Sequence, residues 1–195
     1  MKEKIKILMN GASGKMGRAV GGGLSQLPDM QLVAAVDVKG AGMDMGLLCG
    51  GEPSGILIQP DLNDALAASR PQVMVDFTNP QAVMKNIYAA LSHHVAAVVG
   101  TTGFSEADFQ QVQAWCEEFQ TPVFVAANFA IGAVLLMGFA KEAAKYMPDV
   151  EVIELHHDQK LDAPSGTAVT TLEMMGQVRT PHTQGNPQEL SLIHI

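Results

Sequence analysis

Short continuous runs of apolar residues recur along the chain, separated by turn residues and by longer amphipathic segments. A continuous run of this length predicts a strand that is buried on both faces. The predicted strands are Ile5–Met9, Gln31–Val36, Ile56–Ile58, Gln72–Phe77, Val95–Val99, Val123–Ala126 and Val150–His156. The predicted helices are Lys15–Leu27, Leu62–Ser69, Pro80–Ser92, Ser105–Phe119 and Ala130–Met147. Strand and helix alternate, which is typical of an α/β fold with a doubly wound parallel sheet.

Local signals mark several ends of these elements. Pro80 suits the first turn of a helix, because its missing N–H would have no partner there. Ser105 followed by Asp108 resembles a capping box and predicts a helix start. The run Gly21–Gly23 weakens the first helix by about 1 kcal/mol per glycine relative to alanine. The Gly-rich stretch Lys39–Gly55 is predicted to be a loop.

Length and composition indicate a globular chain of one large domain or slightly more. The chain has 195 residues, of which 47% are apolar, enough for a sizeable core. Only 16% are charged, against about 25% in a typical protein, so some apolar surface should be covered by a partner subunit or a further segment. The alternation of strand and helix fades after about Ser165. We expect a first domain at residues 1–129 and a partial second domain at residues 130–195.

Charge and cysteine content argue against several classes of protein. The net charge of −8 argues against a nucleic-acid-binding surface, which needs a basic stripe. Cys49 and Cys116 are far apart, so neither a zinc site nor a disulfide framework is predicted, and two ordinary thiols suit the cytoplasm. The N-terminus lacks the apolar core of a signal peptide. The apolar stretch 122–140 approaches the length of a membrane span, but it divides at Asn128 into a strand and a helix, so no membrane association is expected.

The turn after the first predicted strand has the pattern G-x-x-G-x-x-G at Gly11, Gly14 and Gly17. This is a variant of the dinucleotide-binding fingerprint, whose glycines permit a tight turn and a close approach of the backbone to a pyrophosphate. The following helix N-terminus would face the phosphates. Asp37, twenty residues after Gly17, can accept hydrogen bonds from both ribose hydroxyls. A carboxylate repels a 2′-phosphate and so favours NAD(H), but Lys39 offsets this in part and leaves NADP(H) open.

Three further predicted strand ends carry small or polar residues. They are residues 75–80, Gly100–Gly103 and Ala126–Phe129. Ligands of a doubly wound sheet lie beyond the carboxyl ends of its strands, so these turns are expected to contact the nicotinamide and its ribose. The Asn128 amide could hold the nicotinamide carboxamide. Each turn alone is more often a simple capping turn, but together at one edge of the sheet they favour a cofactor groove.

A second group of reactive side chains follows the last predicted strand. It contains His156 and His157, Lys160 four residues after the first histidine, and the turn Ser165–Thr167. Histidine exchanges protons near neutral pH, and the lysine supplies a positive charge or a proton. The turn opens a helix whose N–H groups and hydroxyls can bind a carboxylate. Cations beside such a helix start predict a small substrate that carries carboxylates.

A metal site is an alternative for the same segment, because His156, His157 and Asp158 carry groups that can ligate a cation. Adjacent residues on a strand point to opposite faces, so the two histidines make a poor pair of ligands. Histidines with purely structural partners are another alternative. We expect no metal.

Three of these segments together resemble the 4-hydroxy-tetrahydrodipicolinate reductase family, also called dihydrodipicolinate reductase, of lysine and diaminopimelate biosynthesis. They are G-x-x-G-x-M-G at residues 11–17, G-T-T-G at residues 100–103 and E-x-H-H-x-x-K-x-D-A-P-S-G-T at residues 154–167. The resemblance covers residues 4–180. It implies a Rossmann-type domain followed by an α+β substrate domain, which is incomplete here. It also implies reduction of 4-hydroxy-tetrahydrodipicolinate to tetrahydrodipicolinate, with loss of water and with NADH or NADPH as the hydride source.

The resemblance implies roles for individual residues as well. His156 would be the acid/base histidine and Lys160 the proton-donating lysine. The expected substrate contacts, with Ser165 added from the helix-start argument, are His157, Ser165, Gly166 and Thr167. The expected cofactor contacts are Gly11, Ala12, Ser13, Gly14, Lys15, Met16, Asp37, Gly100, Thr101, Thr102, Ala126, Ala127, Asn128 and Phe129.

Two features depart from the family's pattern. Some relatives carry an arginine directly after the ribose-binding acid, where this chain has Val38, which weakens the case for NADPH. Members also continue for some tens of residues past the position of Ile195, and that part supplies most of the substrate domain's sheet and a homotetramer interface. We therefore expect a C-terminally truncated form. The alternatives are another Rossmann oxidoreductase of amino-acid metabolism, which leaves His156 and Lys160 unexplained, and an inactive nucleotide-binding fragment.

Overall fold

The computed structural model describes residues 3–126, 128–156 and 164–180 of the chain. The chain forms two compact units, Met1–Ala126 and Ala127–Ile195, and each is described by itself. The domain boundary expected after residue 129 stays a prediction. Among the described residues, no helix has both the length and the apolar character that a bilayer crossing requires.

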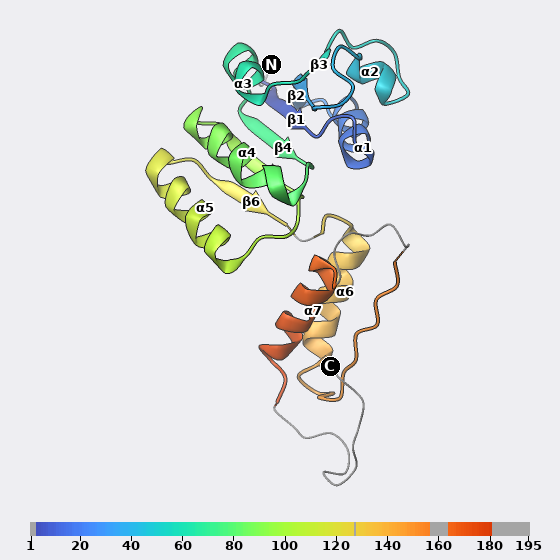
Figure 1. Cartoon of the computed structure of the whole chain (residues 1–195). Coiled ribbons are helices and arrows are strands. Elements are labelled where there is room, and N and C mark those ends of the chain that lie inside the picture. The colour runs from blue at the N-terminus through green and yellow to red at the C-terminus, as the bar shows by residue number, and fades with distance from the viewer. Residues whose placement is uncertain (1–2, 127, 157–163, 181–195) are drawn as a thin grey trace. The chain divides into compact units, whose positions relative to one another are not determined.

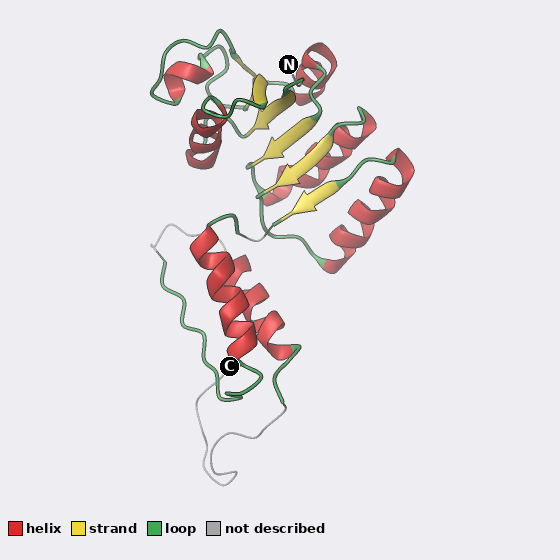
Figure 2. Ribbon diagram, turned by 180° about the vertical axis from the view of Figure 1, so that it is seen from behind, coloured by secondary structure: helices red, strands yellow, loops and turns green. Residues whose placement is uncertain are grey.

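The first unit is built on a six-stranded parallel sheet with the order β3-β2-β1-β4-β5-β6 (Figure 2). Its strands are β1 (Ile5–Asn10), β2 (Met30–Val36), β3 (Ile58–Gln59), β4 (Val73–Asp76), β5 (Ala96–Val99) and β6 (Val123–Val125). Leu8 and Met9 are both fully buried, but in two different core clusters, because successive strand residues point to opposite faces. The expected α/β fold is confirmed. Burial on both faces holds for the central strand β1, whereas Phe124 of the edge strand β6 is 60% exposed.

The described residues of this unit form five helices, which Figure 1 labels. They are α1 (Lys15–Leu24), α2 (Met45–Leu48), α3 (Leu62–Ser69), α4 (Pro80–Ser92) and α5 (Glu106–Phe119). The predicted start of α4 is confirmed, with Pro80 in its first turn and the Asn79 side chain accepting from two backbone N–H groups. The predicted capping box of α5 is also present: Ser105 N–H donates to Asp108 at 2.8 Å, and Asp108 N–H donates to Ser105 Oγ at 3.2 Å.

Two local expectations need correction. The first helix ends at Leu24 rather than Leu27. The stretch 39–55 is not only a loop, because it contains the short helix α2. The Asp44 carboxylate organises that helix by accepting hydrogen bonds from the backbone N–H groups of Leu47, Ser54 and Gly55. These bonds, the one from Ser54 foremost, lower the pKa of Asp44.

The sheet register places the carboxyl ends of neighbouring strands side by side. Asn10 pairs with Val36 on one side and with Asp76 on the other. Asp76 pairs in turn with Val99, and Val99 with Val125. The predicted turns at Gly11, Asp37, residues 77–79, Gly100 and Ala126 therefore leave one edge of the sheet together. β1 lies between β2 and β4, so the chain winds outward from β1 in both directions, and a crevice opens at that switch point.

Two glycines of α1 differ in their surroundings. Gly17 is required for close packing, and Gly23 is not. A Cβ on Gly17 would lie 2.1 Å from the backbone oxygen of Gly11, so the helix could not sit this close to the glycine turn. A Cβ on Gly23 would meet no atom within 4 Å. The same substitution at these two places should therefore have opposite effects.

Gly17→Ala is expected to lower the free energy of unfolding by about 1–3 kcal/mol, because the clash is with backbone that cannot rotate away. Gly23→Ala is expected to raise it by about 0.5–1 kcal/mol, the usual gain in a helix. Urea unfolding of both variants measures the two changes. Equal effects of the two substitutions would contradict the packing that we assign to Gly17.

The described residues of the second unit form two helices, α6 (Ile131–Ala143) and α7 (Gly166–Gly176), which pack side by side (Figure 1). The helix predicted over residues 130–147 thus ends earlier, and Tyr146 and Met147 lie exposed in the turn that follows. The helix start predicted at Ser165 is confirmed. Leu136 and Phe139 of α6 are 66% and 68% exposed, which is apolar surface of the kind that the low charge content indicated.

The strand predicted at Val150–His156 is wrong. The described residues of this segment pair with no other strand, and Ile153 and Leu155 are 76% and 90% exposed. A short apolar run favours an extended backbone, but a strand exists only where a neighbour accepts its hydrogen bonds. No such neighbour lies in the described part of the second unit.

Candidate active site

A groove of about 340 Å³ opens at the switch point of the first unit. Its walls come from the turns after β1, β2 and β4, together with parts of α3 and α4. The lining residues are Asn10, Gly11, Ser13, Gly14, Val36, Asp37, Val38, Lys39, Pro60, Leu62, Phe77, Thr78, Asn79, Ala82 and Asn86. Four of the expected cofactor residues, Gly11, Ser13, Gly14 and Asp37, are among them.

The glycine turn is shaped for close approach of a ligand to the backbone. Gly11 has a φ of +80°, and a Cβ there would lie 2.3 Å from the carbonyl oxygen of Phe77, so only glycine fits. Gly14 is the N-cap of α1 and places no side chain on the first helical N–H groups. Those N–H groups and the positive end of the helix dipole are the elements that bind a phosphate.

Asp37 ties the end of β2 to this turn. Its Oδ2 accepts hydrogen bonds from the N–H and the Oγ of Ser13, at 2.9 and 2.6 Å. Its Oδ1 accepts from the N–H of Lys39 at 2.9 Å. A carboxylate offers about four acceptor positions, so Asp37 retains capacity for a ribose hydroxyl while its own orientation is fixed.

Asp76 is completely buried at the end of β4, and its role was not predicted from the sequence. Its Oδ2 accepts from the side-chain amides of Asn10 and Asn86, both at 2.8 Å. Its Oδ1 accepts from the hydroxyls of Thr78 and Thr101, both at 2.8 Å, and from the N–H of Thr78 at 3.1 Å. One carboxylate therefore joins the ends of β1, β4 and β5 to α4. The only local signal was an acid inside an apolar run.

The turn after β5 is packed against the same group of residues. A Cβ on Gly100 would lie 2.0 Å from the ring of Phe77, so the ring rests directly on this glycine. The Thr101 hydroxyl donates to Asp76 and accepts from the N–H of Thr78 at 2.9 Å. Because that hydroxyl is already engaged at both ends and Thr101 is 6% exposed, its side chain supports the turn, and its backbone is the part it can offer to a ligand.

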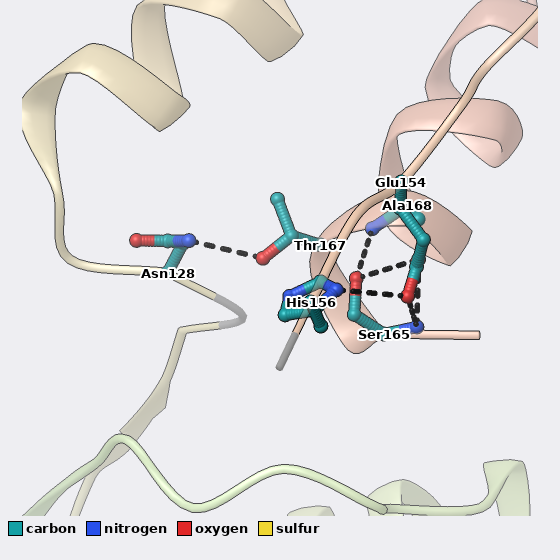
Figure 3. Close-up of polar contacts among 6 residues, drawn as sticks. All are labelled: Asn128, Glu154, His156, Ser165, Thr167 and Ala168. Atoms are coloured by element: carbon teal, nitrogen blue, oxygen red, sulfur yellow. Dashed lines mark hydrogen bonds and ion pairs between the residues drawn. The ribbon is translucent and has the colours of Figure 1, made fainter. Parts of the chain in front are cut away.

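In the second unit, Glu154 lies between His156 and the start of α7 (Figure 3). Its Oε2 accepts hydrogen bonds from the N–H and the Oγ of Ser165, both at 2.9 Å. Its Oε1 lies 3.3 Å from Nδ1 of His156. The Ser165 hydroxyl accepts in turn from the N–H of Ala168 at 3.1 Å, which makes Ser165 the N-cap of α7.

Asn128 joins the starts of the two helices of this unit (Figure 3). Its Oδ1 accepts from the N–H of Ala130 at 2.8 Å, and its Nδ2 donates to the hydroxyl of Thr167 at 3.0 Å. In α7, Ser165 satisfies the N–H of Ala168, and the N–H groups of Gly166 and Thr167 have no partner among the described residues. A helix start with free N–H groups is suited to bind a carboxylate.

Comparison with known proteins agrees with this geometry. The family described as dihydrodipicolinate reductase matches through two parts, the N-terminal one over residues 5–129 and the C-terminal one over residues 132–194. The chain belongs to the dihydrodipicolinate reductase family.

Relatives of this family cover nearly the whole chain. A 4-hydroxy-tetrahydrodipicolinate reductase of Desulfitobacterium hafniense (strain DSM 10664 / DCB-2) is 50% identical over 192 residues, which are 98% of this chain and 72% of the relative. One of Moorella thermoacetica is 46% identical over 95% of this chain and 70% of the relative. The solved structure of a dipicolinate-bound dihydrodipicolinate reductase from Paenisporosarcina sp. TG-14 has a TM-score of 0.75 and 41% identity, and the match covers 97% of this chain and 72% of that one.

The expected site residues of this reductase family member fall into three groups. The glycine turn and Asp37 lie at the groove, with Ala12 buried beneath the turn and Lys15 and Met16 exposed on the first turn of α1. Gly100–Thr102 and Ala126 follow neighbouring strands, and Asn128, Phe129, His156 and Ser165–Thr167 belong to the second unit. Ala127, His157 and Lys160 lie outside the described residues.

Proposed function

We propose that this chain reduces 4-hydroxy-tetrahydrodipicolinate to tetrahydrodipicolinate, as its family does in the pathway to diaminopimelate and lysine. The observation that carries the proposal is His156 close to the start of α7, where the N–H groups of Gly166 and Thr167 have no partner among the described residues. A proton-exchanging side chain next to an anion-binding helix start fits a substrate with carboxylates. A homotetramer and a cytoplasmic location stay predictions.

The residues of the first unit fit a nicotinamide dinucleotide. No side chain caps the first N–H groups of α1, Gly11 tolerates no side chain, and Asp37 keeps acceptor positions for ribose hydroxyls. We propose that NADH is preferred over NADPH, because Asp37 would repel a 2′-phosphate, Val38 beside it carries no charge, and Lys39 would offset the repulsion only in part. When bound, the reduced cofactor would supply a hydride.

The second unit would provide substrate binding and proton transfer. Net reduction adds one hydride and one proton to the substrate and releases one water. The N–H groups of Gly166 and Thr167 would bind a carboxylate and stabilise charge near it. His156 would act as the acid/base group. The family resemblance implies that Lys160 donates the proton and that His157 contacts a carboxylate of the substrate.

The direct test is oxidation of NADH by the purified chain when freshly generated 4-hydroxy-tetrahydrodipicolinate is added. We expect consumption of NADH that depends on this substrate, and slower consumption with NADPH at equal concentration. NADH binding without any turnover would favour the alternative of a nucleotide-binding chain. Turnover of a different amino-acid-derived imine alone would favour another Rossmann oxidoreductase.

Asp37→Ala is expected to weaken NADH binding by about 1–3 kcal/mol, because charge-assisted hydrogen bonds to the ribose are lost. Ser13→Ala is the matched control, since it removes one bond that orients Asp37 and leaves the carboxylate in place. Its effect on affinity should be smaller. Fluorescence titration with NADH measures both variants, and an unchanged affinity in Asp37→Ala would remove Asp37 from the cofactor site.

A further inference from the structure

We infer that Glu154 is a positioning residue that sets the proton arrangement of His156 and ties it to the start of α7. The inference rests on the proposed function for its catalytic consequence, and on the contacts of Glu154 for its structural part. Glu154 would not touch the substrate. It would act through the two groups that do, the imidazole of His156 and the N-terminal N–H groups of α7.

The contacts of Glu154 form a continuous chain through the second unit. Ser165 donates to its carboxylate from both the backbone N–H and the hydroxyl. That hydroxyl caps α7 by accepting from Ala168. Ser165 is buried, with 7% of its surface exposed, so this end of the chain of contacts is fixed. The other carboxylate oxygen faces the imidazole of His156.

These contacts hold two functional groups, the imidazole of His156 and the start of α7, relative to each other. His156 directly precedes residues 157–163, and Ser165 follows them, so one carboxylate joins both ends of that segment. The Glu154 side chain thereby holds the proton-exchanging imidazole at a defined position relative to the anion-binding helix start. Catalysis depends on these relative positions, because misplacement of a reacting group by about 1 Å can lower the rate by about 10²-fold.

The approach of Glu154 to Nδ1 also selects a tautomer of His156. A carboxylate can only accept a hydrogen bond, so neutral His156 is expected to carry its proton on Nδ1 and to leave Nε2 with a lone pair. A partner of this kind on one ring nitrogen determines the chemistry of the other. A role limited to capping α7 would not impose this arrangement, so the tautomer distinguishes positioning from simple support.

The test compares Glu154→Gln with Glu151→Gln, which removes the same charge from an exposed residue of the same segment. In Glu154→Gln, we expect kcat to fall by about 10–100-fold with unchanged NADH affinity. We also expect neutral His156 to shift from the Nδ1–H toward the Nε2–H tautomer, because the amide can donate to Nδ1. Nitrogen-15 NMR of the histidine rings reports the tautomer, and the spectrum of His156→Gln assigns the signals. Glu151→Gln should match the wild type in both measurements.

Ser165→Ala keeps the inference testable if Glu154→Gln does not fold. It removes the capping hydroxyl and leaves Glu154 facing His156, so melting should occur at a lower temperature while the Nδ1–H tautomer persists. An unchanged tautomer in Glu154→Gln, or the same tautomer shift in Ser165→Ala, would overturn the positioning role. If the wild type lacks reductase activity, the proposed function fails, and the tautomer measurement still decides whether Glu154 orients the ring.

Discussion

Replacement of His156 by glutamine is expected to lower kcat by about 10²–10⁴-fold, the usual contribution of a positioned general acid or base. Glutamine retains polarity and similar bulk but exchanges no proton near neutral pH. NADH affinity should not change, because the groove with the glycine turn and Asp37 is made by residues of the first unit. Steady-state kinetics and a fluorescence titration with NADH measure the two quantities separately.

The matched control is His93→Gln, which makes the same substitution at an exposed position after α4. It should retain the full kcat. Wild-type turnover in His156→Gln would remove His156 from the chemistry. A parallel loss of NADH affinity would show that the substitution disturbs more than proton transfer.

Asp76→Ala is expected to lower the free energy of unfolding by about 3–5 kcal/mol, because several buried donors lose their acceptor at once. The donors come from Asn10, Thr78, Asn86 and Thr101. Asp76→Asn should cost less, about 1–3 kcal/mol, since the amide keeps one acceptor oxygen. Both variants should also bind NADH more weakly, because Asn10, Thr78 and Asn86 line the groove.

Urea unfolding and NADH titration of both variants test this expectation. Asp29→Ala, at an exposed aspartate before β2, is the control and should change stability by less than about 0.5 kcal/mol. A similarly small change in Asp76→Ala would mean that the hydrogen-bonded network around Asp76 contributes little to the fold. Lower stability with unchanged NADH affinity would mean that this network stabilises the fold but does not shape the groove.

The sequence predicted the first unit well because its signals are local. Each of its predicted strands and helices is present, since a run of apolar residues or a capped amphipathic segment favours its own structure wherever it lies. The turn from Gly11 to Gly17 was predicted for the same reason. Its glycines are required by contacts within a few residues and with the neighbouring strand end.

The strand predicted at Val150–His156 failed because strand pairing is not local. Apolar residues such as Ile153 and Leu155 fit the pattern of a strand, but the described residues offer no neighbouring strand. The glycine run in α1 predicted a weaker helix than the structure contains. It lowers helix propensity, yet the helix forms, and Gly21 is buried where α1 packs closely on Met45 of α2.

By itself, the sequence determined the order of strands and helices, the glycine turn, Asp37 and the reactive segment around His156, because each is encoded in residues close together along the chain. Only the tertiary structure decided that Asp76 gathers Asn10, Asn86 and Thr101, and that Glu154 joins His156 to Ser165. The first group of contacts depends on which strands become neighbours and in what register. The second depends on where the start of α7 lies relative to His156. Neither leaves a periodic trace in the sequence, since a hydrogen bond between distant residues is specified by the packing of whole elements.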